Sequence, residues 1–353
     1  MALFGNGPNS SNGAPVLFVV DLQSGRVLRA LKPSGEDHAQ RNGLMHIAPV
    51  ALANSDGLVD TVYGGDLRGN VWKFDLGDAS STEWEVAFGG EPLFTAMRGG
   101  ARQPVAGAIE VSRGPVGGVT LFFGTGRYFA HGDNENTAVQ TLYSIWDGPG
   151  AARISGGRDA LVAQTISAGV TSNGHATRNV SRNPVSYATH RGWYVDLLVN
   201  DSAQGERFIG EPRLQSGKVI FPTYVPGQAV CSAGGGTNWQ YALDLLTGGA
   251  AMSGVSLDPA GDSPVCSGAD CGGISLNKGG DTSAPVKTVD VFVPKPLRPG
   301  VGGGGGVCTP GDEDCSVDEL LGASKCTFVL HTPGADPLYL PRPCGRQSWR
   351  QVR

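Results

Sequence analysis

Hydrophobic and polar residues alternate along much of this chain in short runs, each followed by an aspartate and a glycine-bearing turn. The clearest copy is residues 60–76, where two alternating runs flank the tight turn Leu-Arg-Gly-Asn. Alternation with a period of two predicts β-strands, and a tight turn between two such runs predicts a hairpin. Similar phrases occur at residues 16–28, 142–150, 193–197 and 239–248. Irregular repetition of strands with almost no helical period predicts an all-β fold, specifically a β-propeller.

The composition agrees with a turn-rich β protein and narrows the function classes. Glycine accounts for 55 of 353 residues, and charged residues make up 17%, against about 25% in ordinary proteins. The net charge is -5 and the basic residues are scattered, so nothing favours nucleic acid as a partner. No run approaches the roughly 18 continuous apolar residues of a membrane span. The N-terminus also lacks the charged-then-apolar layout of a signal peptide.

The cysteines all lie in the last 123 residues of the chain. They are Cys231, Cys266, Cys271, Cys308, Cys315, Cys326 and Cys344. The spacings Cys-x4-Cys and Cys-x6-Cys differ from the Cys-x2-Cys of zinc sites, so we expect disulfides in preference to zinc. Disulfides persist in oxidising compartments, which indicates an exported protein.

The composition also divides the chain into three predicted parts. Residues 1–253 carry the blade-like phrases, residues 254–306 form a Gly/Ser/Pro-rich insertion and linker, and residues 307–353 form a Cys-rich tail. The first residues look like the middle of a blade. We therefore expect a modified, incomplete propeller from the C-terminal portion of a longer protein, with earlier blades missing here.

A set of phrases in a fixed order resembles the C-terminal propeller domain of the PilY family of type IV pilus biogenesis factors and tip adhesins. The phrases are residues 4–7, 17–25, 62–76, 123–128, 141–147, 192–197 and 246–249. The resemblance implies export through the periplasm to the bacterial surface or pilus tip. It further implies contacts with pilins, other pilus components and host or abiotic surfaces. The implied role is to support pilus extension relative to retraction, twitching motility and surface adhesion.

The resemblance also implies a regulatory calcium loop, with side-chain ligands at positions one, three, five and nine and a main-chain carbonyl at seven. Carried across, Asn54 stands at position three, Asp56 at five, Leu58 at seven through its carbonyl, and Asp60 at nine. Position one is Leu52, whose side chain cannot bind an ion. The loss of one carboxylate leaves two, and we expect a lower calcium affinity. The alternative is a turn stabilised by Asn and Asp side chains, with no ion.

No catalytic constellation emerges from the remaining residues. The six histidines show no pair at metal-site spacing, and no serine stands in Gly-x-Ser-x-Gly beside plausible partners. The acidic cluster at residues 133–136 predicts a solvated loop. We therefore predict a non-enzymatic pilus factor. The alternatives are a quinoprotein-like propeller dehydrogenase, which stacks similar blades, and a general surface adhesin without a pilus role.

Overall fold

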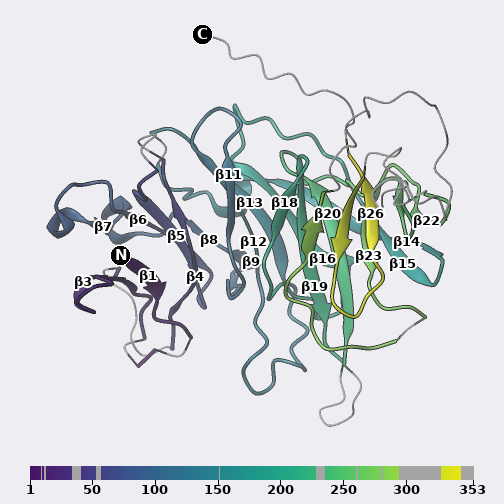
Figure 1. Ribbon diagram of the computed structural model, residues 1–353, viewed down its shortest axis with the longest axis horizontal. Helices are drawn as coiled ribbons and strands as arrows, with labels where there is room; N and C mark the ends of the chain where they lie inside the picture. Colours follow the sequence, from purple (N-terminus) through teal and green to yellow (C-terminus); the bar gives the residue numbers. More distant parts are fainter. Residues whose placement is uncertain are drawn as a thin grey trace, which may run out of the picture.

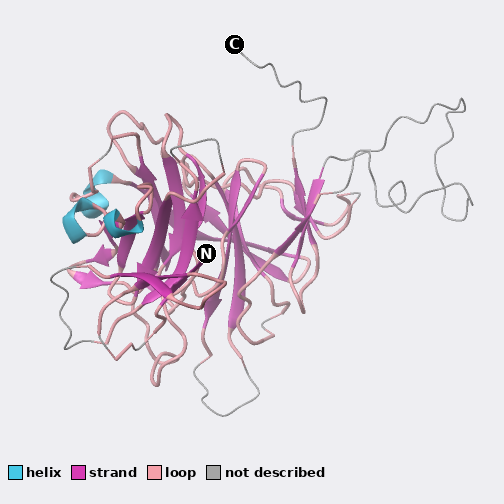
Figure 2. Ribbon diagram, turned by 60° about the vertical axis from the view of Figure 1, so that its left-hand side comes forward, coloured by secondary structure: helices cyan, strands magenta, loops and turns pink. Residues whose placement is uncertain are grey.

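Strands dominate the described part of the chain, and helix there is confined to short 3₁₀ turns (Figure 2). The computed structural model describes residues 1–8, 10–11, 13–33, 41–52, 57–150, 152–227, 235–259, 261–279, 281–293 and 327–342. The helical turns in these ranges are η1 (Ser81–Glu83), η2 (Phe88–Gly90) and η3 (Gly157–Ala160). None of the helices in these ranges has the length and apolar character needed to cross a membrane.

The N-terminal strands form two antiparallel sheets. The first has the order β1–β2–β3, and the second has the order β4–β5–β6–β7 with β8 also paired to β6. The strands are β1 (Ala2–Gly5), β2 (Leu17–Val20), β3 (Val27–Leu31), β4 (Leu44–Val50), β5 (Thr61–Asp66), β6 (Asn70–Asp75), β7 (Glu85–Val86) and β8 (Phe94–Thr95). A small hairpin of β9 (Met97–Arg98) and β10 (Ala101–Arg102) follows.

The largest sheet has the order β11–β12–β13–β16–β14–β15–β23–β20–β19–β18, with β17 paired to β16. Its strands are β11 (Glu110–Arg113), β12 (Val119–Gly124), β13 (Thr141–Asp147), β14 (Val162–Ser172), β15 (His175–Val180), β16 (Gly192–Val199), β17 (Ser202–Ala203), β18 (Arg213–Gln215), β19 (Lys218–Val225), β20 (Thr237–Asp244) and β23 (Cys271–Ser275). The last sheet has the order β22–β21–β26–β25–β24. Its strands are β21 (Val255–Ser256), β22 (Pro264–Cys266), β24 (Asp290–Phe292), β25 (Thr327–His331) and β26 (Leu338–Pro341).

The strands form blades whose first strands lie next to one another. Contacts join β1 to β4, β4 to β11, and β11 to β18, so the successive first strands surround a common axis as in a propeller. Backbone hydrogen bonds continue this arrangement. The amide of Ala108 donates to the carbonyl of Gly210 at 2.9 Å, and the amide of Glu211 donates to the carbonyl of Lys287, just before β24, at 2.8 Å. Figure 1 shows the blades following one another in chain order. The all-β propeller prediction is confirmed.

The propeller is modified by the hairpin β14–β15, which merges two blades into one sheet. β14 pairs in parallel with β16, the last strand of the blade β11–β12–β13–β16. β15 pairs antiparallel with β23, the last strand of the blade β18–β19–β20–β23. The hairpin therefore connects the outer edges of two neighbouring blades, which would otherwise expose unpaired backbone groups.

The predicted linker contains strands. Within the described part of residues 254–306, β21, β22, β23 and β24 all belong to sheets, and β23 lies inside the largest one. Residues 327–341 of the predicted tail supply β25 and β26. Low hydrophobicity concealed β23, because four of its five buried positions are filled by cysteine, glycine and serine.

One disulfide is present in the described residues. It joins Cys266 at the end of β22 to Cys271 at the start of β23, with 6.0 Å between the Cα atoms. This pair is the predicted Cys-x4-Cys, so a disulfide is confirmed there. Both cysteines are buried in a hydrophobic core that the largest and last sheets share. The other five cysteines lie outside the described residues.

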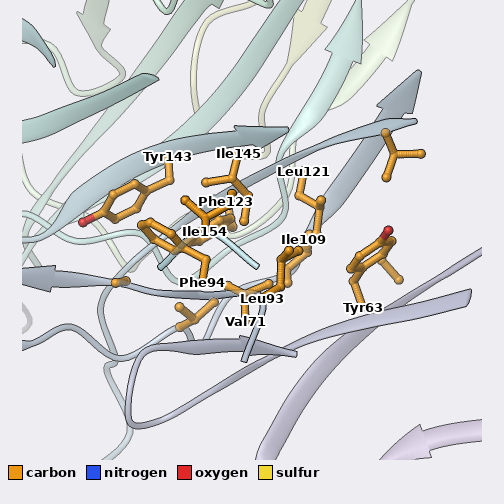
Figure 3. Packing of buried hydrophobic residues seen from close by; sticks show 14 of the residues in the cluster. Tyr63, Val71, Leu93, Phe94, Ile109, Leu121, Phe123, Tyr143, Ile145 and Ile154 are labelled. Atoms are coloured by element: carbon orange, nitrogen blue, oxygen red, sulfur yellow. The ribbon is translucent and has the colours of Figure 1, made fainter. Parts of the chain in front are cut away.

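Aromatic packing joins the second blade to the third. Phe94 from the β8 region contacts Tyr143 of β13 edge-on, with 5.3 Å between ring centroids, and Tyr143 stacks on Phe123 of β12 at 5.3 Å. All three side chains are buried. Figure 3 shows them interleaved with Val71, Leu93, Leu121 and Ile145 between the two sheets. This cluster fixes the relative position of the blades that flank the candidate site.

The turn between β5 and β6 is organised by the buried carboxylate of Asp66. Its Oδ2 accepts hydrogen bonds from the side chains of Asn42 (3.0 Å), Asn70 (2.9 Å) and Trp72 (2.9 Å). Its Oδ1 accepts from the amides of Arg68 at 2.8 Å and Asn70 at 2.9 Å. The aspartate that ends the strand is therefore structural, as expected for a hairpin residue.

Replacement of Asp66 tests this assignment. Asp66→Ala leaves several buried donors without an acceptor, and each such donor costs about 1–3 kcal/mol, so we expect the free energy of unfolding to fall by about 3 kcal/mol. Urea denaturation measures the change. Glu85→Ala, at an exposed position of β7, is the control and is expected to change stability by less than about 0.5 kcal/mol. Equal effects of the two substitutions would contradict the assignment.

Candidate functional site

The predicted calcium loop is the connection between β4 and β5, where Val50 is paired with Thr61. The amide of Asp60 donates to the carbonyl of Val50 at 3.1 Å, and the carbonyl of Asp60 accepts from the amide of Leu76 at 2.8 Å. Asp60 is thus held on both sides by backbone hydrogen bonds. The blade itself positions the last predicted ligand.

The carboxylate of Asp60 connects the two ends of this loop. Its Oδ1 and Oδ2 accept from the amide of Leu52 at 3.0 and 2.8 Å. The hydroxyl of Thr61 donates to Oδ1 at 2.9 Å. Asp60 is 8% exposed. The residue at predicted position nine therefore binds the backbone of the residue at position one, even though Leu52 carries no carboxylate.

The structure describes only part of the predicted ligand set. Asn54 and Asp56 lie outside the described residues. Leu58 is described, with a side chain that is 69% exposed, and it follows Gly57, whose φ of 77° is the left-handed conformation that a sharp bend needs. In the described ranges no three His, Cys, Asp or Glu side chains gather as a metal site. The four-residue ligand set stays a prediction.

The fit to calcium can be judged at Asp60. Calcium takes oxygen ligands, and a carboxylate oxygen has lone pairs for more than one partner. Leu52 and Thr61 both donate to Asp60, so the carboxylate is already oriented at the closure of the loop. Its chemistry fits a calcium ligand. If an ion binds, Asp60 would hold it together with Asn54, Asp56 and the carbonyl of Leu58.

A large cleft lies beside this loop, between the second and third blades. We call it the interblade cleft, and its volume is about 1080 Å³. Its walls come from residues 49–52, 60–61, 73, 75, 77, 111–114, 117–119 and 147–150. Asp60 is among these residues, so the loop and the cleft share a side chain. A second hollow, of about 580 Å³, also includes Asp60 and contains Leu58.

Asp147 is a residue of the interblade cleft whose importance the sequence did not reveal. It is 3% exposed. Its Oδ2 accepts from the hydroxyl of Tyr63 at 2.6 Å and forms an ion pair with Nζ of Lys73 at 2.7 Å. Burial, together with the nearby charges of Asp147 and Asp60, raises the pKa of Tyr63, which therefore remains a donor. In the sequence, Asp147 is one of several aspartates that follow a strand-like run, and this pattern indicates only a hairpin residue.

The acidic cluster at residues 133–136 has a structural role at its first residue. Asp133 is 2% exposed, whereas the sequence predicted a solvated loop. Its carboxylate pairs with Arg127 at 2.9 Å and accepts from the amides of Phe129 at 3.0 Å and Ala130 at 2.8 Å. Through these contacts the carboxylate of Asp133 stabilises its own loop.

Comparisons with known proteins agree with this geometry. A family model described as the PilY1 beta-propeller domain matches residues 1–175. A type IV pilus biogenesis factor PilY1 homolog of Xylella fastidiosa is 42% identical over 100% of this chain and 24% of that protein. The type IV pilus biogenesis factor PilY1 of Pseudomonas aeruginosa is 32% identical over 99% of this chain and 30% of that protein.

A solved structure shares the fold along nearly the whole chain. The crystal structure of the Pseudomonas aeruginosa PilY1 C-terminal domain superposes with a TM-score of 0.70 at 25% sequence identity, covering 97% of this chain and 69% of that one. The fold and its matches define a modified β-propeller of the kind found in type IV pilus biogenesis factors. The chain belongs to the PilY1 family, and the predicted resemblance is confirmed. It spans only 24% and 30% of the two curated relatives.

Removal of the Asp60 carboxylate tests its role in closing the loop. Asp60→Ala leaves the Leu52 amide and the Thr61 hydroxyl without this acceptor, so we expect a loss of about 1–3 kcal/mol in the free energy of unfolding. The measurement is denaturation in the presence of a calcium chelator, which separates the hydrogen bonds from any bound ion. Unchanged stability in chelator would contradict a structural role for the carboxylate.

Proposed function

We propose that this chain is a non-enzymatic part of a type IV pilus factor that works at the bacterial surface or pilus tip. The observation that carries the proposal is the match along essentially the whole chain to proteins described as type IV pilus biogenesis factors. The propeller offers loops for protein contacts on a rigid scaffold. Its partners are pilins and other pilus components. The factor supports pilus extension relative to retraction, twitching motility, and attachment to host or abiotic surfaces.

The proposal includes regulation by calcium at the loop that ends in Asp60. A bound cation would offset the charges of Asp56 and Asp60 and order the connection between β4 and β5. Occupancy then biases the assembly to the extent that calcium binds its two forms differently. Support comes from the oriented carboxylate of Asp60 and its contact with Leu52. With Leu52 in the first ligand position, the affinity belongs at the low end of the range for calcium loops.

Calcium titration of the purified chain tests the loop. A dissociation constant of about 10⁻⁴–10⁻³ M is typical of extracellular modules. About 10 mM calcium should then raise the free energy of unfolding by roughly 1.4–2.7 kcal/mol. Asp60→Asn, which keeps the size of the side chain, should abolish this gain. Leu52→Asp places a carboxylate at position one, and this added ligand should tighten binding at least tenfold. The fold should tolerate the substitution because Leu52 is already 38% exposed.

Calorimetry on the same three proteins measures these affinities directly. Calcium heats that are identical in the wild type and in Asp60→Asn would place any binding elsewhere. No heat in either the wild type or Leu52→Asp would make the connection a plain turn, as the alternative reading of residues 54–60 holds.

The pilus assignment is tested in cells. A deletion strain should lose twitching motility, measured as the width of the spreading zone, and the full-length wild-type gene should restore it. The matched strain carries full-length protein with Asp60→Asn and should fail to respond to added calcium. Normal twitching in the deletion strain, with attachment alone lost, would favour a general adhesin. Oxidation of a dye after addition of pyrroloquinoline quinone would favour a propeller dehydrogenase.

A further inference from the structure

The interblade cleft contains an acceptor that its surroundings leave unused. Among the described residues, Oδ1 of Asp147 is buried and has no hydrogen-bond partner, whereas Oδ2 is bound by Tyr63 and Lys73. An ionised carboxylate oxygen that is shielded from water without a donor costs free energy. A ligand that supplies a donor at this position would recover that cost.

The charges around the interblade cleft favour a positively charged ligand. Its walls carry the carboxylates of Asp60, Asp75 and Asp147 against two basic side chains, Lys73 and Arg113. Lys73 is already committed to Oδ2 of Asp147 at 2.7 Å. The remaining acidic groups leave the cleft with an excess of negative charge.

The arrangement is suited to an organic cation rather than a metal ion. Across the described chain, no three acidic, histidine or cysteine side chains approach one another closely enough to share a metal. The carboxylates of the cleft are instead spread over a volume of about 1080 Å³. A long side chain that ends in an ammonium or guanidinium group can cross such a space and donate to one carboxylate at its end.

Glycines contribute much of the third-blade wall of the interblade cleft, beside side chains such as Arg113 and Pro149. Gly117 and Gly118 adopt φ values of 87° and 65° in the turn between β11 and β12. A Cβ on Gly118 would lie 2.2 Å from the carbonyl oxygen of Asp147, so a side chain cannot be accommodated there. Gly148 and Gly150 extend the same wall. At Gly150 a Cβ would meet nothing within 4 Å, and this open space gives an extended peptide room beside the wall.

We propose that the interblade cleft binds an extended peptide segment of a partner protein by receiving a lysine or arginine side chain, whose terminal N–H donates to Oδ1 of Asp147. Lys73 and Tyr63 hold the carboxylate in place for this contact. The site lies beside the calcium loop, but it does not require an ion or a pilus role. Its failure would therefore leave the proposed function standing, and the reverse also holds.

The indole of Trp146 provides a reporter for the test. Its Nε1 donates to the carbonyl of Gly117, in the wall of the cleft, at 2.9 Å. The probe is the pentapeptide Gly-Ser-Lys-Ser-Gly, acetylated at its N-terminus and amidated at its C-terminus. The control peptide is identical except that the lysine amine is acetylated. Titrations follow the Trp146 indole resonance of the purified chain by NMR, with Trp146→Phe identifying the signal.

We expect the lysine peptide to shift the Trp146 resonance saturably, with a dissociation constant of about 1 mM or below. The acetylated peptide should bind at least tenfold more weakly. Asp147→Asn keeps the shape of the side chain but removes its charge, and it should weaken the lysine peptide at least tenfold. Asp290→Asn, at an exposed position of β24 in the last sheet, makes the same chemical change away from the cleft and should leave binding unchanged.

Two results would overturn the proposal. One is equal affinity for the lysine and acetylated peptides, since the donor cation would then contribute nothing. The other is the absence of any shift with the lysine peptide up to about 20 mM, well above the affinity range of a weak specific site. Should Asp147→Asn fail to fold, the two peptides compared on the wild-type chain still decide the question.

Discussion

Buried side chains join the second blade of this propeller to the third, and the position of the candidate site depends on that constraint. Between the second and third blades, the carboxylate of Asp147 binds Tyr63 and Lys73, which are 84 and 74 residues away in sequence. Beneath this contact, Phe94 packs against Tyr143. Loss of one partner from a buried, hydrogen-bonded ion pair is far more costly than an exposed pair is worth. The geometry of the interblade cleft is therefore fixed by the same contacts that align the two blades.

The third and fourth blades are joined in a different way, by paired strands. Here the hairpin β14–β15 supplies backbone hydrogen bonds to both blades, so two four-stranded units become one continuous sheet. The inserted hairpin also carries Arg178, which is 2% exposed and pairs with Glu206 while its guanidinium lies 3.5 Å from the ring centroid of Trp239. This junction is therefore closed by paired strands and by a buried ion pair. The open cleft between the second and third blades is by contrast available for contacts.

The sequence predicted what is local and missed what depends on distant neighbours. The alternating run from residue 60 to residue 76 and its glycine turn give β5, β6 and the position of Asp66, because strand pattern and turn chemistry act over a few residues. The strand β23 lies in residues 254–306, for which the Gly/Ser/Pro-rich composition predicts an insertion and linker. A Cβ on Gly272 would lie 2.5 Å from Val180, and one on Gly273 would lie 2.9 Å from Tyr241. Gly272 and Gly273 are therefore needed for close packing, whereas composition alone interprets glycine as a sign of flexibility.

At the site, the family resemblance singled out Asp60, but nothing in the sequence indicated Asp147, since the partners of Asp147 come from another blade. Their relation has a physical consequence. Asp60 closes the loop through the Leu52 amide and also lines the interblade cleft. A ligand that binds the Asp60 carboxylate must change the hydrogen bonds of Asp60 to the loop, the charge at the cleft, or both. If calcium and a cleft ligand both bind and both draw on Asp60, their binding would be coupled, with the same coupling free energy in both directions. One aspartate thus makes the loop and the cleft parts of a single surface.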